Sequence, residues 1–318
     1  KHPMNGLELS RSYFEEYGRP LLRQQYPYFE EHIAAGLAGM GSECFGFDDE
    51  ISRDHDWGPA FCLWLDRRTF DAIGKELQAS LAGLPRTFAG FTGRQESHWG
   101  GGRTGVFEIG QFYRQFIGYD HVPADWREWR VIPESNLATA TNGRVFIDPA
   151  GEFSAFREKL KQFYPEDIRL KKMACRCMIM AQSGQYNFRR CVRRGEYVAA
   201  QCAETEFINT AVSLVFLLNK QYKPFYKWMH RALRELPRLG EVIYDLCSDL
   251  TTAHTAASGQ RIYELKSDRI ATICRHIVGE LKRQELTDSD SDFLLDHGPL
   301  IQSRIQDPVI KSISVWAE

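Results

Sequence analysis

Asp54 and Asp56 are the residues of this sequence whose type and spacing best suit chemistry, and they precede an apolar run of strand length at residues 60–65. In an extended chain alternate side chains share a face, so we expect both carboxylates to point the same way. Two neighbouring carboxylates repel each other unless a cation lies between them. Mg²⁺ suits this place, because it prefers oxygen ligands and usually keeps waters and substrate phosphates in its shell.

Gly41 and Ser42 lie about a dozen residues before the aspartates. A Gly-Ser turn lets backbone N–H groups and a hydroxyl approach phosphate oxygens closely. Glu108 is a lone acid in the apolar segment 105–109, where an unpaired charge would be costly. We expect Glu108 to join the aspartates as a third metal ligand or as the general base. Such a set suits metal-assisted phosphoryl or nucleotidyl transfer.

The first half of the chain predicts an α+β domain at residues 1–150. Residues 7–36 have helical spacing, with a kink at Pro20. Thr69 can cap a helix that runs through Leu81. Strands are expected at residues 60–65, 87–91, 105–109 and 145–147.

After Pro149 helical periodicity dominates, so we predict an all-helical bundle at residues 151–318. The expected helices are 153–163, 166–182, 196–220, 224–236, 239–256, 260–284 and 290–296.

Gly-Ser, a gap of about a dozen residues and Asp-x-Asp at a strand resemble the signature of the DNA polymerase β-like nucleotidyltransferase superfamily. Within it the chain is most similar to the aminoglycoside and lincosamide (kanamycin-type) antibiotic nucleotidyltransferases and to related uncharacterised bacterial proteins. The resemblance implies a mixed sheet with helices, followed by a helical bundle. It also implies Mg²⁺-dependent transfer of AMP from ATP to a hydroxyl of a small molecule, with release of pyrophosphate.

The segment LLNKQYKPFYKW at residues 217–228 resembles the bundle motif whose lysine contacts nucleotide phosphates. The resemblance implies this role for Lys227, and it makes Lys223 and Asn219 further candidates for the nucleotide site. A solvated basic face is the alternative for the lysines. The chain departs from the antibiotic enzymes in the bulky, acidic spacer 43–50 and in Val106, where those enzymes can carry a lysine.

Three weaker signals remain. Glu206 is a candidate base in the bundle, with a surface position as the alternative. His98 and Trp99 precede a run of three glycines that could form a lid. A basic cluster is compatible either with RNA phosphates or with a solvated face; it comprises Arg189, Arg190, Arg193 and Arg194.

Composition limits the class of protein. The net charge of −2 does not indicate a protein that binds nucleic acid. No apolar stretch reaches the roughly 20 residues of a membrane helix. No secretion signal is recognisable, and eight irregularly spaced cysteines are typical of a reducing cytoplasm. The alternatives to small-molecule transfer are transfer to a protein or RNA acceptor and a non-catalytic ATP-binding sensor. Neither the acceptor nor the oligomeric state can be predicted from the sequence.

Overall fold

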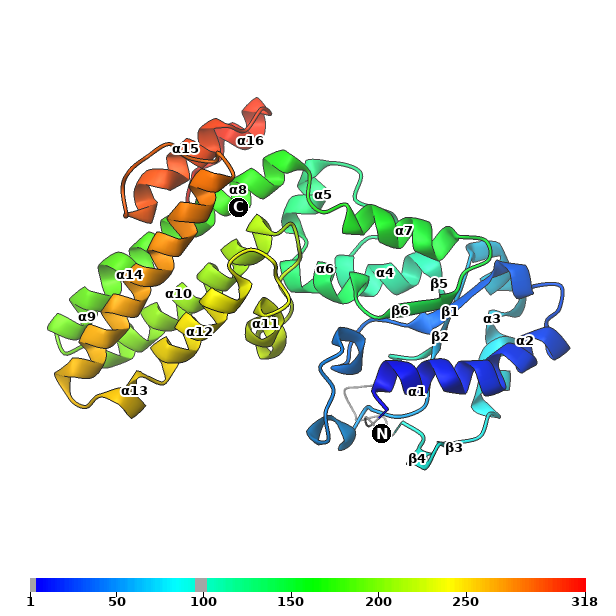
Figure 1. Ribbon diagram of the computed structural model, residues 1–318. Coiled ribbons are helices and arrows are strands. Elements are labelled where there is room, and N and C mark those ends of the chain that lie inside the picture. Colours follow the sequence, from blue (N-terminus) through cyan, green and yellow to red (C-terminus); the bar gives the residue numbers. More distant parts are fainter. Residues whose placement is uncertain (1–3, 95–101) are drawn as a thin grey trace. The chain divides into compact units, whose positions relative to one another are not determined.

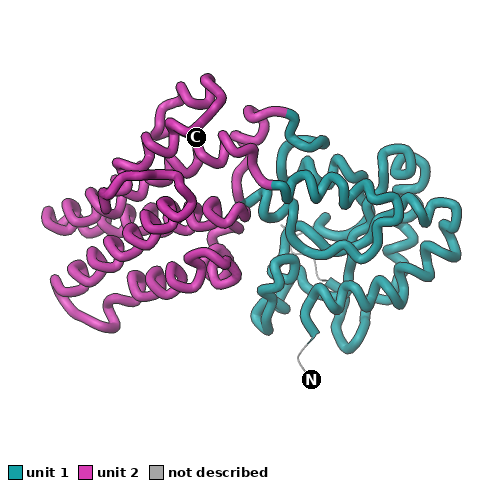
Figure 2. Tube along the Cα trace, turned by 45° about the horizontal axis from the view of Figure 1, so that its top comes forward, with its two compact units in different colours: residues 1–124, 135–162 teal, residues 125–134, 163–318 magenta. Residues whose placement is uncertain are grey.

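The computed structural model describes residues 4–94 and 102–318, and the chain divides into two compact units (Figure 2). Unit 1 comprises residues 1–124 and 135–162, and unit 2 comprises residues 125–134 and 163–318. The chain therefore passes from one unit to the other three times. The sequence predicts a single domain boundary near residue 150. In the structure, by contrast, residues 125–134 already belong to unit 2, and the last passage from unit 1 to unit 2 follows residue 162.

Unit 1 contains a mixed four-stranded sheet in the order β5–β2–β1–β6 (Figure 1). The strands are β1 (Ile33–Leu37), β2 (Cys62–Leu65), β5 (Gly105–Glu108) and β6 (Arg144–Ile147). β1 is antiparallel to β2 and β6, and β2 is parallel to β5. The end of β1 thus lies beside the starts of β2 and β5, at what we call the β1-exit edge. A separate hairpin is formed by β3 (Thr87–Phe88) and β4 (Phe91–Thr92).

Helices cover both faces of the sheet, because successive side chains of β2 point to opposite sides. Leu63 packs with Phe14 and Leu77 in a core cluster built with α1 (Gly6–Tyr13), the π-helical turn Phe14–Gly18, α2 (Arg19–Gln25) and α3 (Arg67–Ala82). Trp64 points to the other face, where its ring stacks on Phe153 with centroids 3.8 Å apart. That face carries α4 (Ile109–Ile117) and α7 (Glu152–Lys161).

Three expectations for unit 1 are wrong in detail. The helix predicted over 7–36 ends at Gln25, and residues 33–37 form the central strand β1. Gly36 explains the choice, since a Cβ there would collide with the carbonyl oxygen of Arg144 on the neighbouring strand. Asp66, not Thr69, caps α3 by accepting the N–H of Thr69 at 3.0 Å. The strand at 105–109 stops at Glu108, because α4 begins at the next residue.

Helices alone form the described part of unit 2. They are α5 (Trp126–Val131), α8 (Glu166–Met180), α9 (Arg189–Arg193), α10 (Tyr197–Leu218), α11 (Tyr226–Leu233), α12 (Gly240–Thr251), α13 (Ala253–Ala256), α14 (Gln260–Arg283), α15 (His297–Ser303) and α16 (Pro308–Ser312); α6 (Glu134–Thr141) begins at the last residue of the segment 125–134. The predicted fold class, an α+β domain with a mixed sheet followed by a helical bundle, is confirmed.

Two bundle helices differ from expectation. The helix predicted over 166–182 runs on through a π-helical stretch, Ala181–Phe188, into α9. Gly184 allows this path, because a Cβ there would collide with the ring of Phe207. The helix predicted over 290–296 begins only at His297, after the 3₁₀ turn Leu294–Asp296. Among the described residues, no helix combines the length and the apolarity that crossing a membrane requires.

Candidate functional site

The turn after β1 is held by one asparagine. The backbone N–H of Gly39 donates to Asn142 Oδ1 at 2.8 Å, and Asn142 Nδ2 donates to the Gly39 carbonyl at 2.8 Å. Gly39 and Gly41 both have positive φ, at 107° and 135°, which favours glycine. The Gly41-Ser42 pair therefore follows β1 in a tightly specified turn at the β1-exit edge.

Ser42 has a fixed backbone and a hydroxyl without a hydrogen-bond partner in the described residues. Its carbonyl oxygen accepts the N–H groups of Phe45 at 3.1 Å and Phe47 at 2.9 Å, which fixes the backbone. Its half-buried hydroxyl makes no hydrogen bond to any residue in the described ranges. Gly41 has to be glycine, because a Cβ would lie 2.5 Å from a carboxylate oxygen of Glu43.

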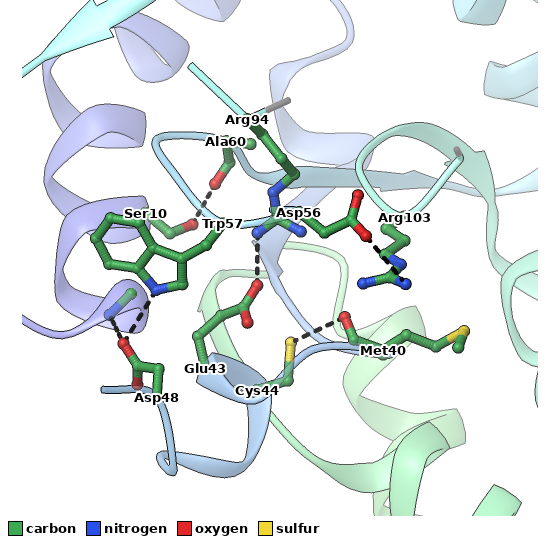
Figure 3. Close-up of polar contacts among 12 residues, drawn as sticks. Ser10, Met40, Glu43, Cys44, Asp48, Asp56, Trp57, Ala60, Arg94 and Arg103 are labelled. Atoms are coloured by element: carbon green, nitrogen blue, oxygen red, sulfur yellow. Dashed lines mark hydrogen bonds and ion pairs between the residues drawn. The ribbon is translucent and has the colours of Figure 1, made fainter. Parts of the chain in front are cut away.

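Two buried ion pairs lie beside this turn (Figure 3). Arg94 Nη2 lies 2.6 Å from Glu43 Oε1, and their side chains are 5% and 2% exposed. Arg103 Nη2 lies 3.4 Å from Asp56 Oδ2, and the Asp56 side chain is 4% exposed. We call Glu43, Asp56, Arg94 and Arg103 the edge cluster. Burying charge in this way is costly, and such groupings are typical of functional sites.

The edge cluster surrounds two buried thiols. Burial raises the pKa of the Cys44 thiol well above its ordinary value, and the charges of Glu43, Arg94 and Arg103 also act on it. Burial likewise raises the pKa of Cys62 to about 12. Both thiols are therefore protonated near neutral pH and are poor nucleophiles.

The edge cluster was missed in part by the sequence reasoning. The sequence indicates Glu43 only as one residue of the bulky, acidic spacer 43–50. Arg94 and Arg103 carry no spacing signal, since their partners lie 51 and 47 positions earlier in the chain. Only the pairing of strands brings these residues together.

Asp54 and Asp56 do not share a face, so that expectation is wrong. Residues 54–56 form a bend before β2 instead of an extended strand, and Asp56 has a positive φ of 52°. The Asp54 side chain is 63% exposed and lies 2.6 Å from His55 Nδ1, whereas Asp56 is buried. The turn at Asp56 sends one carboxylate into the edge cluster and leaves the other in solvent.

Glu108 does not join the aspartates, and the predicted convergence of three carboxylates is wrong. It lies opposite Leu65 on the parallel strand β2, at the edge away from the Gly-Ser turn. Four residues of strand separate the two edges by roughly 10 Å. Glu108 is the N-cap of α4 and accepts N–H groups from Gly110 at 3.0 Å and Gln111 at 2.7 Å. This capping role explains a lone acid at the end of an apolar strand.

The described residues contain no group of three or more His, Cys, Asp and Glu side chains that could hold a metal ion. The predicted set Asp54, Asp56 and Glu108 is therefore not a preformed magnesium site. Asp54 and Asp56 are neighbours in the loop before β2, but only the Asp54 carboxylate is open to solvent.

In unit 2, Asn219 has a structural role. Its side-chain amide donates to the carbonyl oxygens of Val215 and Arg238 at 2.8 and 2.9 Å and accepts the N–H of Arg238 at 3.0 Å. All its strong hydrogen-bonding groups thus secure the end of α10. This is not the nucleotide contact that the sequence suggests.

The candidate lysines Lys223 and Lys227 do not lie along one helix, because α10 ends at Leu218 and α11 begins at Tyr226. Lys223 donates from Nζ to Asn209 Oδ1 at 3.3 Å, and burial lowers its pKa. Lys227 is exposed, with Nζ 5.0 Å from the Trp228 ring centroid. Of the bundle candidates, Lys227 keeps the freest ammonium group.

Two further candidates are less informative. Glu206 is exposed on α10 and accepts the Thr210 hydroxyl at 3.4 Å. His98 and Trp99 lie outside the described residues.

Two comparisons with known proteins gave a match. Residues 129–229 match a family model described as "Domain of unknown function (DUF4037)". In structure the chain is similar to the nucleotidyltransferase-like protein from Exiguobacterium sibiricum 255-15, at 14% sequence identity and a TM-score of 0.36, with 86% of this chain and 76% of that chain covered. No curated protein matches the chain. Likeness at these values assigns no activity, so the function has to be argued from the side chains.

Proposed function

We propose that the chain is a nucleotidyltransferase that moves AMP from ATP to a hydroxyl of a small molecule and releases pyrophosphate. One observation carries the proposal. Because β1 and β2 are antiparallel, the Gly41-Ser42 turn and Asp56 lie at the same edge of the sheet. That edge combines a buried carboxylate, a serine hydroxyl with no partner in the described residues, and two arginines whose side chains are 5% and 20% exposed.

The donors at this edge suit a triphosphate. Within the described residues, Nε and Nη1 of Arg94 and Nε of Arg103 are buried and lack a hydrogen-bond partner. Guanidinium groups bind phosphate oxygens through a planar fork, and they stabilise the charge that develops during transfer. We assign the phosphates to Ser42, Arg94 and Arg103 of unit 1. Lys227 of unit 2 stays a candidate phosphate ligand through the motif around it.

ATP normally carries Mg²⁺ on its phosphates, and such an ion needs only one or two protein carboxylates. We assign Asp54 and Asp56 to this role, with Mg²⁺ as part of the substrate. The acceptor hydroxyl then attacks the α-phosphorus in line and loses its proton to solvent. The bond from the α-phosphorus to the oxygen that bridges it to the β-phosphate breaks, and pyrophosphate leaves. We also propose a cytoplasmic location, since all eight cysteines are free thiols.

The proposal is tested by labelled ATP, Mg²⁺ and a library of small hydroxylated acceptors. We expect Asp54→Asn/Asp56→Asn to lower transfer by at least about 100-fold, the scale on which charge-stabilising groups act. Glu50→Gln is the matched control, because Glu50 is an exposed acid of the same loop. Unchanged transfer by the double variant would refute the assignment.

A non-catalytic ATP-binding sensor is the second candidate. It is favoured by the lack, in the described residues, of a preformed group of three metal ligands. ATP binding seen by calorimetry, without pyrophosphate release in the presence of any acceptor, would support this candidate.

Transfer to RNA is a third possibility. Arg189 and Arg193 line a hollow of about 300 Å³ in unit 2, together with Glu264 and Asp268. The two arginines are the feature that favours an anionic polymer. RNA binding that weakens steeply with salt would support it, and unmeasurable binding at low salt would exclude it.

A further inference from the structure

Helix α8 carries a group of cations that are almost completely buried in unit 2. Lys171 is 1% exposed and Lys172 is 5% exposed, and the Arg176 side chain one turn later is 15% exposed. Arg130 of α5 lies close enough to lower the pKa of both lysines, after the larger effect of burial. We call Arg130, Lys171, Lys172 and Arg176 the α8 cation cluster.

The hydrogen bonds of Lys171 go to neutral oxygens. Its Nζ donates to Gln302 Oε1 at 2.7 Å and to the Ser314 carbonyl at 2.6 Å. A buried ammonium group without a counter-ion is unfavourable, because burial removes the water that stabilises its charge.

Two carboxylates in the described residues face the cluster. One oxygen of Glu318 lies 2.8 Å from Lys172 Nζ, and the other contacts Arg176 Nη1. Glu134 is reached through a serine, since Arg176 Nε donates to Ser213 Oγ at 3.0 Å and that hydroxyl donates to Glu134 Oε2 at 2.8 Å. The four cations of the cluster therefore exceed the negative charge that contacts them.

Two polar groups beside the cluster have no partner in the part of the chain that the structure describes. The Tyr164 hydroxyl is buried, on a residue that is 4% exposed, and Lys172 Nζ lies 5.2 Å from the centroid of its ring. The second group is Arg130 Nε. Unsatisfied buried donors next to surplus positive charge indicate that acceptor oxygens are missing.

The Glu318 carboxylate belongs to residues 314–318, a segment that makes few hydrogen bonds to α8. Residues 314–318 include an exposed Trp316, at 43%, and contact α8 through the Ser314 carbonyl and through a Cys175 Sγ to Trp316 O contact of 3.3 Å. Few bonds would have to break for the Glu318 carboxylate to leave the cations.

We propose that the α8 cation cluster is a binding site for a phosphate anion, and that the Glu318 carboxylate occupies it when no phosphate is bound. A phosphate group offers more negative charge and more acceptor oxygens than one carboxylate, and the arginine fork matches its geometry. The site lies wholly within unit 2 and needs neither Asp54 nor Asp56, so it goes beyond the proposed nucleotidyl transfer.

The experiment is a calorimetric titration with pyrophosphate in Mg²⁺-free buffer. The parent is the full chain with Asp54→Asn/Asp56→Asn. The edge cluster of unit 1 is the same in every variant compared, so any pyrophosphate that it binds cancels from the comparison. Adding Glu318→Gln should tighten binding about tenfold, because the competing charge is gone. Glu241→Gln is the control, an exposed glutamate of α12 in the same unit, and it should bind like the parent. Adding Arg176→Gln should abolish the part of the binding that Glu318→Gln tightens.

Displacement of the segment can be observed directly. Pyrophosphate should change the tryptophan emission of the parent, and Trp316→Phe should remove that change. Inorganic phosphate and ATP are compared in the same assay, and the tighter of the two identifies a free phosphate or a nucleotide as the ligand.

The proposal is overturned if Glu318→Gln and the parent bind pyrophosphate equally, or if neither binds it. Should Arg176→Gln fail to fold, as judged by circular dichroism, the Glu318→Gln comparison decides alone.

Discussion

Glu43 and Asp56 bring negative charge into the interior of unit 1, and each meets an arginine there. Removing one partner of a buried ion pair is far more damaging than removing both, because it leaves an uncompensated charge. The edge cluster can therefore be tested through stability, separately from any activity.

Arg94→Met should lower the free energy of unfolding by about 3 kcal/mol, because it leaves the Glu43 carboxylate buried and unpaired. Glu43→Gln/Arg94→Met should recover most of that loss. Urea denaturation of the two single variants and the double variant measures the coupling. Additive losses would show that the two side chains do not interact as described.

Glu108 has a different kind of role, at the start of α4. Glu108→Ala should cost about 1 kcal/mol of stability through loss of the N-cap and should leave the rate of nucleotidyl transfer unchanged. Glu108→Asp should restore stability, since aspartate is a good N-cap. A large fall in transfer rate in a folded Glu108→Ala protein would contradict the capping assignment.

At the scale of elements, α8 packs in the interior of unit 2 and also carries charged side chains there, two properties that usually exclude each other. It is the central helix of unit 2, packed against α10 and α15, and it carries four cationic side chains into that packing: Arg169, Lys171, Lys172 and Arg176. Burial lowers the pKa of Lys171 to about 8, from an ordinary value of 10.5. Cys175 opposes this shift, and Arg130 adds to it with the smallest effect of the three.

The lowered pKa predicts how stability depends on pH. Between about pH 8 and 10.5 the unfolded chain binds more protons at Lys171 than the folded chain, so the contribution of Lys171 to stability improves as pH rises. Lys171→Met should therefore be more stable relative to wild type at pH 7 than at pH 9, by about 1 kcal/mol. Urea denaturation of both proteins at the two pH values measures the difference, and comparison with wild type cancels other titrating groups. A difference that does not change with pH would contradict a lowered pKa.

At the scale of the whole molecule, the chain is not two segments joined end to end. Residues 125–134 belong to unit 2 although unit 1 resumes at Ser135. Trp129 from this segment packs edge-on against Tyr164 with ring centroids 5.9 Å apart, and Glu134 accepts the Lys223 N–H at 3.1 Å.

A fragment of residues 151–318 should therefore fold poorly, because it lacks the segment 125–134. Adding a separate peptide of residues 125–134 should raise its melting temperature. Circular dichroism melts of the fragment with the peptide, and with a peptide in which Trp129 and Glu134 are alanine, provide the comparison. A fragment that melts as cooperatively as the full chain would show that the segment is dispensable.

The sequence by itself determined the features that depend on near neighbours. Apolar spacing predicted the bundle helices, the apolar run predicted β2, and Gly41-Ser42 predicted a tight turn, because each pattern is local. The fold class followed from the order of these elements.

Tertiary structure alone decided which side chains meet. Glu108 lies away from the aspartates because β5 is parallel to β2, and a four-residue pattern does not encode strand direction. Asp56 turns inward because of one positive φ, and Arg94 reaches Glu43 across 51 positions. Glu318 contacts Arg176 of α8, although the two residues are 142 positions apart in the sequence. Contacts of this range depend on how whole elements pack, so only the folded chain defines the edge cluster and the α8 cation cluster.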